Sequence, residues 1–160
     1  MYSLPPKPLN NLVLFNNKDS RTIVFVDSNL PDCEQIVQQV VSEARAIIIG
    51  SEDDGIVEIS RLLDSSSCSE VHIFASGFPG CVYLGNSELS FDTLKTYQPS
   101  LENWFLNNSA KKHASASLYL YCRNLDMGKT GNKFVAQLSQ ITQAEIHTFS
   151  SSLNSNILIG

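Results

Sequence analysis

The sequence lacks any excess of basic residues. Its 11 Lys and Arg residues are outnumbered by 16 Asp and Glu residues, and the formal net charge is −5 at pH 7. No basic run is longer than the pair at 111–112, so there is no positive field to hold a phosphate backbone. We therefore expect no nucleic acid among the partners of this chain.

Long apolar runs and a secretory signal pattern are also missing. No apolar stretch reaches the roughly 18 residues of a membrane-spanning helix, so no membrane span is predicted. Residues 1–11 contain three prolines and lack the basic and apolar parts of a secretory signal. Export by that route is not predicted from this N-terminus.

The sequence has few cysteines, and none of them forms a CxxC pair. Their scatter argues against a zinc site and against a small disulfide scaffold, so we expect free thiols that pack as small hydrophobic side chains. The four cysteines are Cys33, Cys68, Cys81 and Cys122.

Motifs for bound phosphate or metal are absent as well. The glycines at 50–55 and 77–80 do not fit the G-x-x-x-x-G-K-S/T pattern, and Ser76 is not in a G-x-S-x-G elbow. The acids at 52–54 lack the spaced ligands of an EF-hand loop and are interpreted as the acidic start of a helix. We predict no metal and no cofactor.

What is present is enough apolar material for one domain. The chain has 160 residues, of which 42% are hydrophobic and 17% are charged, and single cores usually serve about 100 to 200 residues. Residues 1–21 are predicted to be an N-terminal arm or linker, with one apolar island at 12–15 that could form a short edge strand. Residues 22–160 are predicted to form the α/β domain.

Strand and helix patterns alternate along that domain. β-branched and aromatic runs predict buried strands, and apolar residues at helical spacing predict the helices between them. We expect an α/β three-layer sandwich with a mostly parallel sheet of order 2-1-3-4-5, as in flavodoxin-like folds. The predicted strands are 22–27, 46–49, 71–75, 117–121 and 145–149, with a hairpin or flap at 81–84 and 87–90. The predicted helices are 32–43, 56–64, 91–97, 99–112 and 129–142, with a turn at 77–80.

Ligands of such sheets bind at the carboxyl ends of the strands, where the strand order reverses. The residues expected around this crevice are Asp27, Ser28, Ser76, Gly77, Cys122, Arg123 and Asn124.

Several of the same segments carry a family resemblance. They are 23–28 (Ile-Val-Phe-Val-Asp-Ser), 54–55 (Asp-Gly), 71–80 (Val-His-Ile-Phe-Ala-Ser-Gly-Phe-Pro-Gly), 83–89 (Tyr-Leu-Gly-Asn-Ser-Glu-Leu), 120–124 (Leu-Tyr-Cys-Arg-Asn) and 134–138 (Phe-Val-Ala-Gln-Leu). Over about 22 to 152 the chain resembles an uncharacterised bacterial domain family found near the start of very long surface or secreted proteins with cadherin-like and calcium-binding repeats. That family is similar to the caspase and gingipain group of cysteine peptidases.

The resemblance implies a catalytic dyad that this chain does not have. In the caspase and gingipain group a His follows the third strand and a Cys follows the fourth. In the resemblance these positions sit in Ser-His-Gly and Tyr-Gly-Cys-Asn motifs. Here Ser76 stands at the His position and Arg123 at the Cys position. Cys122 is one residue early, and a one-residue shift turns a side chain to the opposite face, so we expect it to point into packing.

These departures favour a pseudo-peptidase, a binding or assembly module that would be the N-terminal domain of a larger bacterial surface or secreted protein. The expected partner is another protein or a further copy of the chain. The alternative is an active cysteine peptidase that uses Cys122 with a displaced histidine, although His72, His113 and His147 are each better explained as structural residues.

Two further points stay open. A third interpretation, an intracellular adaptor unrelated to peptidases, would gain support if side chains filled the crevice. The resemblance implies a secreted or cell-surface location, while the free cysteines and the missing signal also fit the cytoplasm.

Overall fold

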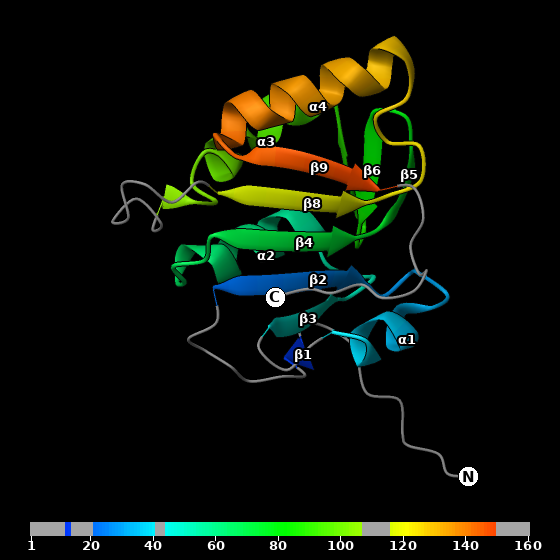
Figure 1. Cartoon of the computed structure of the whole chain (residues 1–160), viewed down its shortest axis with the longest axis vertical. Helices are drawn as coiled ribbons and strands as arrows, with labels where there is room; N and C mark the ends of the chain where they lie inside the picture. The colour runs from blue at the N-terminus through cyan, green and yellow to red at the C-terminus, as the bar shows by residue number, and fades with distance from the viewer. Residues whose placement is uncertain (1–11, 14–20, 41–43, 107–115, 150–160) are drawn as a thin grey trace, which may run out of the picture.

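The main sheet of the protein has parallel central strands. The computed structural model describes residues 12–13, 21–40, 44–106 and 116–149, and its larger sheet has the order β1-β3-β2-β4-β8-β9 (Figure 1). The strands are β1 (Leu12–Val13), β2 (Thr22–Asp27), β3 (Arg45–Ile49), β4 (Glu70–Phe74), β8 (Ser117–Tyr121) and β9 (Glu145–Phe149). Only β1 pairs in the antiparallel direction.

This arrangement confirms the predicted topology. Counted without the short edge strand β1, the five parallel strands have the order 2-1-3-4-5. The apolar island at 12–15 does supply the edge strand, of which Leu12–Val13 lies among the described residues.

Both faces of the sheet are buried near its centre, because β2 alternates between two hydrophobic clusters. Ile23 and Phe25 belong to the larger cluster, whereas Val24 and Val26 belong to the smaller one on the opposite face. All six residues of β2 are buried. This explains why β2 has a continuous apolar run rather than alternating apolar and polar residues.

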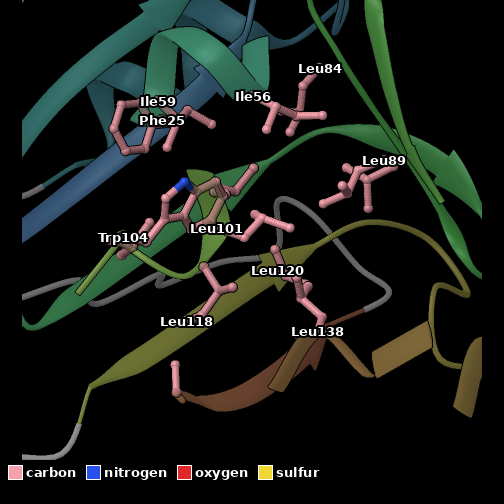
Figure 2. Packing of buried hydrophobic residues seen from close by; sticks show 14 of the residues in the cluster. Phe25, Ile56, Ile59, Leu84, Leu89, Leu101, Trp104, Leu118, Leu120 and Leu138 are labelled. Atoms are coloured by element: carbon pink, nitrogen blue, oxygen red, sulfur yellow. The ribbon is translucent and has the colours of Figure 1, made fainter. Parts of the chain in front are cut away.

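The helices form the two outer layers. Helices α2 (Gly55–Asp64), α3 (Leu94–Leu101) and α4 (Gly128–Thr142) contribute to the larger cluster, and α1 (Cys33–Gln38) contributes to the smaller one. Figure 2 shows the larger cluster, to which Ile56 and Ile59 of α2, Leu138 of α4 and Leu118 and Leu120 of β8 all belong. The three layers of the predicted sandwich are therefore present.

Three of the helix predictions are wrong. The helix expected at 32–43 ends at Gln38, because the amides of Gln39 and Val40 bond to carbonyls only three residues back and close the helix with a tight turn. Residues 41–43 lie outside the described residues.

The helices expected at 91–97 and 99–112 are replaced by the single helix α3, and Pro99 lies inside it. Pro99 has no N–H for the carbonyl four residues back, but bonds from Tyr97 to Thr93 and from Glu102 to Gln98 continue the helix on either side. Residues 107–115 lie outside the described residues.

A small antiparallel sheet follows β4, and we call it the flap. It consists of β5 (Ser76–Phe78), β6 (Cys81–Leu84) and β7 (Ser87–Ser90) in that order. The predicted hairpin is confirmed as β6 and β7, but the turn predicted at 77–80 is wrong in part, because Gly77 lies in β5 and only Gly80 has a positive φ, of +79°. Leu84 and Leu89 of the flap pack into the larger cluster (Figure 2).

Candidate functional site

The candidate site lies where β5 runs beside the loop that follows β8. The Ala75 amide donates to the Tyr121 carbonyl at 3.1 Å, and the Gly80 amide donates to the Leu125 carbonyl at 2.9 Å. Between these two bonds, a Cβ atom placed on Gly77 would lie 2.7 Å from Cys122 Sγ. Strand β5 therefore lies beside residues 121–125, the loop that follows β8.

Ser76 and Arg123 lie on the outer surface of these neighbouring segments. Both side chains are exposed, as is that of Asn124, whose φ of 56° turns the chain after Arg123. Their chain neighbours differ: Gly77 is half-buried and Cys122 is buried. The two positions at which the resemblance implies a dyad thus carry a hydroxyl and a guanidinium at adjacent strand ends.

Cys122 points away from that surface. Its side chain is 3% exposed and packs in the larger cluster, with Sγ 3.9 Å from the Cys81 carbonyl oxygen. Desolvation by burial, with a smaller contribution from Cys81, raises the pKa of the Cys122 thiol to about 12. A thiol in this environment stays protonated at neutral pH and is a poor nucleophile.

The described histidines are on the other face of the sheet from Cys122. His72 lies on β4 between Val71 and Ile73, which both pack in the cluster that contains Cys122, and side chains alternate along a strand. His147 is level with His72, because both are paired with Tyr119 in the sheet register. His113 lies outside the described residues.

Asp27 is covered by the flap rather than open to solvent. Its side chain is fully buried, and Oδ1 accepts hydrogen bonds from the amides of Gly85 and Asn29 and from Asn29 Nδ2 at 3.3 to 3.4 Å. Oδ2 has no hydrogen-bond partner. Desolvation raises the pKa of this carboxyl, and the hydrogen bonds to Oδ1 only partly oppose that effect.

The Gly85–Asn86 turn is held there by several further bonds. Asn29 Nδ2 donates to the Gly85 carbonyl at 3.2 Å, and the Asn86 amide donates to the Asp53 carbonyl at 2.8 Å. Ser28 is half-buried beside this turn and its amide donates to Ile49. The residues predicted around one crevice therefore fall into two groups: Asp27 lies under the flap tip, whereas Ser76 and Arg123 are exposed after β4 and β8.

The acidic turn before α2 serves the helix. Asp54 is the N-cap residue, and its Oδ1 accepts from the amides of Ile56 and Val57. Its Oδ2 accepts from the Tyr97 hydroxyl at 2.7 Å. This geometry agrees with the interpretation of 52–54 as a helix start.

The sequence did not predict the exposed apolar side chains on the flap and on the loop before α4. Phe78 and Tyr83 of the flap are exposed, and so is Met127 of the loop before α4. The exposure of Tyr83 could have been predicted from β6, where Tyr83 lies between the apolar residues Val82 and Leu84. Phe78 has no such signal, because β5 was not predicted as a strand.

The fold defines the class: a three-layer α/β domain with a mostly parallel sheet, in which a small antiparallel flap covers the carboxyl end of β2. The chain belongs to the family described as domain of unknown function DUF4347, whose model matches residues 23–156. A search of curated proteins finds no match to the chain. Among the described residues, no helix has the length and apolar character needed to cross a membrane.

Proposed function

We propose that this domain is a non-catalytic binding or assembly module, a pseudo-peptidase with a caspase-like fold. The observation that carries the proposal is the pair Ser76 and Arg123, exposed at adjacent strand ends where the resemblance implies His and Cys. Neither a hydroxyl without a base nor a guanidinium can act as the nucleophile of that dyad. The surface that would hold a substrate is retained without the groups that would cleave it.

The resemblance supports the biological setting of this proposal. The domain would be the N-terminal part of a larger bacterial surface or secreted protein, and its partner would be another protein or a further copy of the chain. Detection of the native protein on intact cells or in the culture medium tests this placement, and confinement to the cytosolic fraction would contradict it.

The rival function is a cysteine peptidase that uses Cys122. The burial of Cys122, its raised pKa and its separation by the sheet from His72 and His147 all weigh against it. Peptidase chemistry needs a thiolate and a base within hydrogen-bond reach of it.

A cleavage assay tests the proposal against this rival. The purified chain is incubated with a mixed peptide library, and new termini are counted by mass spectrometry for the wild type, Cys122→Ala and Cys68→Ala. Cys68 is the matched control because it is a second buried thiol with a pKa raised to about 12. We expect no cleavage by any of the three. Cleavage that persists in Cys68→Ala and disappears in Cys122→Ala would establish the peptidase instead.

A further inference from the structure

The last strand of the large sheet, β9, has one side without a neighbouring strand. Strand β9 lies at the end of the sheet beyond β8 (Figure 1), and among the described residues it pairs with β8 alone. The Phe149 carbonyl accepts from the Cys122 amide at 3.1 Å, so the backbone groups of Phe149 face the β8 side. Successive residues of a strand direct their backbone groups to opposite sides. The N–H and C=O of Thr148 therefore point away from the sheet.

This edge of β9 is open to solvent and has little that would prevent pairing with another strand. Phe149 is 42% exposed, and residues 146–148 are half-buried. Edge strands of folded proteins commonly contain Lys, Pro or a bulge that blocks a further strand. Strand β9 contains none of these, and its one acid, Glu145, stands at its start. The edge can therefore accept a further strand.

Two rows of stacked rings end at the same edge. In one row Tyr119 of β8 stacks on His147 with the ring centroids 4.6 Å apart, and in the other row Tyr121 stacks on Phe149 at 4.8 Å. Both rows continue on the far side of β8 to rings of β4. Each of the three strands carries its two rings two residues apart. A strand that extends both rows must carry rings at that spacing.

Strands β4, β8 and β9 of this chain have the required spacing, and β4 and β8 already have neighbours on both sides. We infer that two copies of the chain associate edge to edge through β9, antiparallel about a two-fold axis perpendicular to the sheet. This inference rests on the proposed function, for which it specifies the partner.

The ring rows fix the position of the axis. It passes between the two Thr148 residues, and each Thr148 N–H donates to the Thr148 carbonyl of the other copy. His147 of each copy then stands opposite Phe149 of the other copy, in the kind of antiparallel pair whose side chains are closest. Both rows of rings continue from one copy into the other, and the interface is the same patch on both copies, as a two-fold dimer requires.

Sedimentation velocity of the full chain over a range of concentrations tests the inference. We expect the wild type to change from monomer to dimer as the concentration rises, with weak affinity, because a five-residue edge buries less area than a standard interface. Phe149→Lys should stay monomeric, because a Lys on an edge strand opposes pairing and the last ring of one row is lost. Phe91→Lys is the control, since Phe91 is 48% exposed but lies outside β9. It should dimerise like the wild type.

Substitution of Thr148 tests the backbone bonds at the axis. Thr148→Pro removes the outward N–H and leaves the bonds between β9 and β8 in place, so the fold should persist while the dimer is lost. Thr148→Val is the matched control, because both variants lose the bond from Thr148 Oγ1 to Asp126 and only valine keeps the N–H. Thr148→Val should still dimerise. Circular dichroism of every variant checks that the fold is kept.

Disulfide trapping tests the register of the two strands. His147→Cys and Phe149→Cys chains are treated with oxidised glutathione, each alone and as a mixture. The mixture should form the intermolecular disulfide, because positions 147 and 149 stand opposite each other, whereas two copies of position 147 are a diagonal pair beyond the reach of a disulfide. The native thiols are buried. Equal cross-linking of His147→Cys alone would overturn the inferred axis.

A wild type that stays monomeric at every concentration would overturn the inference. A dimer that persists in both Phe149→Lys and Thr148→Pro, or that Phe91→Lys dissociates equally, would do the same. Cleavage by the chain in the peptide-library assay would contradict the proposed function instead, and would leave the dimer to be judged by sedimentation.

Discussion

Asp27 is a carboxyl group in an environment that disfavours its charge. It has no exposed surface, and Oδ2 lacks a hydrogen-bond partner. We predict that Asp27→Asn raises the free energy of unfolding by roughly 1 kcal/mol at pH 7, because the variant buries no charge and keeps an oxygen for the Gly85 amide. Urea denaturation measures the change, and exposed Asp92→Asn is the control.

The pH dependence of this effect has a definite sign. Burial raises the pKa of Asp27 in the folded protein above its ordinary value of 3.8, so the folded state keeps the proton longer than the unfolded state does. The contribution of Asp27 to stability is therefore complete below that ordinary value and is lost as the pH rises through the folded pKa. Asp27→Asn should lack this loss, and a variant that loses stability in parallel with the wild type would contradict the assignment.

The reactivity of the cysteine thiols gives a second test at the level of single residues. Burial raises the pKa of Cys33 to about 11 and those of Cys68 and Cys122 to about 12, and it also raises the pKa of Cys81. We predict that the folded protein reacts slowly with a disulfide reagent at pH 8 and that all four cysteines react in denaturant. The absorbance of the released thiol measures both rates. A fast phase in the folded protein that is lost in Cys122→Ala would favour the peptidase.

The positions of some site residues could be predicted from the sequence, and those of others could not. Ser76 and Arg123 could be placed from the sequence, because each follows a strand whose apolar run marks its end. The burial of the Asp27 side chain could not be predicted, because it depends on the Gly85 turn, which lies 58 residues away along the chain. The exposure of Phe78, Tyr83 and Met127 was missed for a related reason, because it depends on which side chains the rest of the fold covers.

Among the elements, long periodic segments were predicted best. Helices α2 and α4 and the five parallel strands each have a run of apolar residues at a single spacing. Strand β5 was missed because three residues that include a glycine carry no period, and its pairing is imposed by β6. Helix α1 ends early in a tight turn at Gln39 and Val40, and α3 continues past Pro99 through backbone bonds on either side of it.

The position of the flap depends on the glycine at its tip. Gly85 has a φ of +64°, and a Cβ there would lie 2.1 Å from the Asp53 carbonyl oxygen. Gly128 has a similar φ of +70°, but no atom lies within 4 Å of a Cβ placed on it. We predict that Gly128→Ala costs roughly 1 kcal/mol of stability, from backbone strain alone, and that Gly85→Ala costs about 2 kcal/mol or more.

Urea denaturation of the two glycine variants under identical conditions makes this comparison. Both variants place a Cβ in an unfavourable backbone conformation. The difference between their free energies of unfolding therefore measures the contact between the flap tip and the turn before α2. Equal losses of stability in the two variants would mean that the flap tip can move away from Asp53 without cost.

For the whole molecule, stacked rings join the β4, β8 and β9 strands on the face opposite α2, α3 and α4. Tyr119 is stacked between His72 and His147, with ring centroids 4.3 and 4.6 Å away. Tyr121 is stacked between Phe74 and Phe149 in the next row, at 4.0 and 4.8 Å. This arrangement ties three strands together through their side chains, in addition to the backbone ladder.

The buried histidine in that stack makes global stability depend on pH. His72 Nδ1 lies 2.9 Å from the Tyr121 hydroxyl, while Nε2 is 3.2 Å from Glu70 Oε2 without the alignment of a hydrogen bond. Burial lowers the pKa of His72, and nearby Glu70 only partly opposes this. The folded state therefore binds fewer protons than the unfolded state just below the ordinary pKa of 6.5.

We predict that the free energy of unfolding falls as the pH drops from about 6.5 toward the folded pKa of His72. His72→Gln should flatten this part of the profile, although it lowers stability overall through the lost stacking. His147→Gln is the comparison, because His147 is half-exposed on the edge strand β9 and its charge makes only a minor contribution to lowering the pKa of His72, so the decline should remain. A decline that persists unchanged in His72→Gln would show that another group is responsible.

The general architecture could be predicted from the sequence because it depends on the order of strands and helices. The parallel order 2-1-3-4-5 follows from alternating strand and helix patterns and right-handed crossovers. The division of the crevice by the flap could not be predicted, since Asn29, Asp53 and Gly85 are distant in the sequence and meet only in the folded chain.

The central claim is that positions 76 and 123, which follow neighbouring strands of the sheet, are the places at which a peptidase dyad would stand. The most direct test compares Arg123→Cys with the double variant Ser76→His, Arg123→Cys, by measuring the alkylation rate of the introduced thiol against pH with mass spectrometry. The buried native thiols should react slowly under the same conditions. We predict a lower apparent pKa of the introduced thiol in the double variant, because an adjacent imidazole stabilises the thiolate. Identical pH profiles in the two variants would contradict the claim.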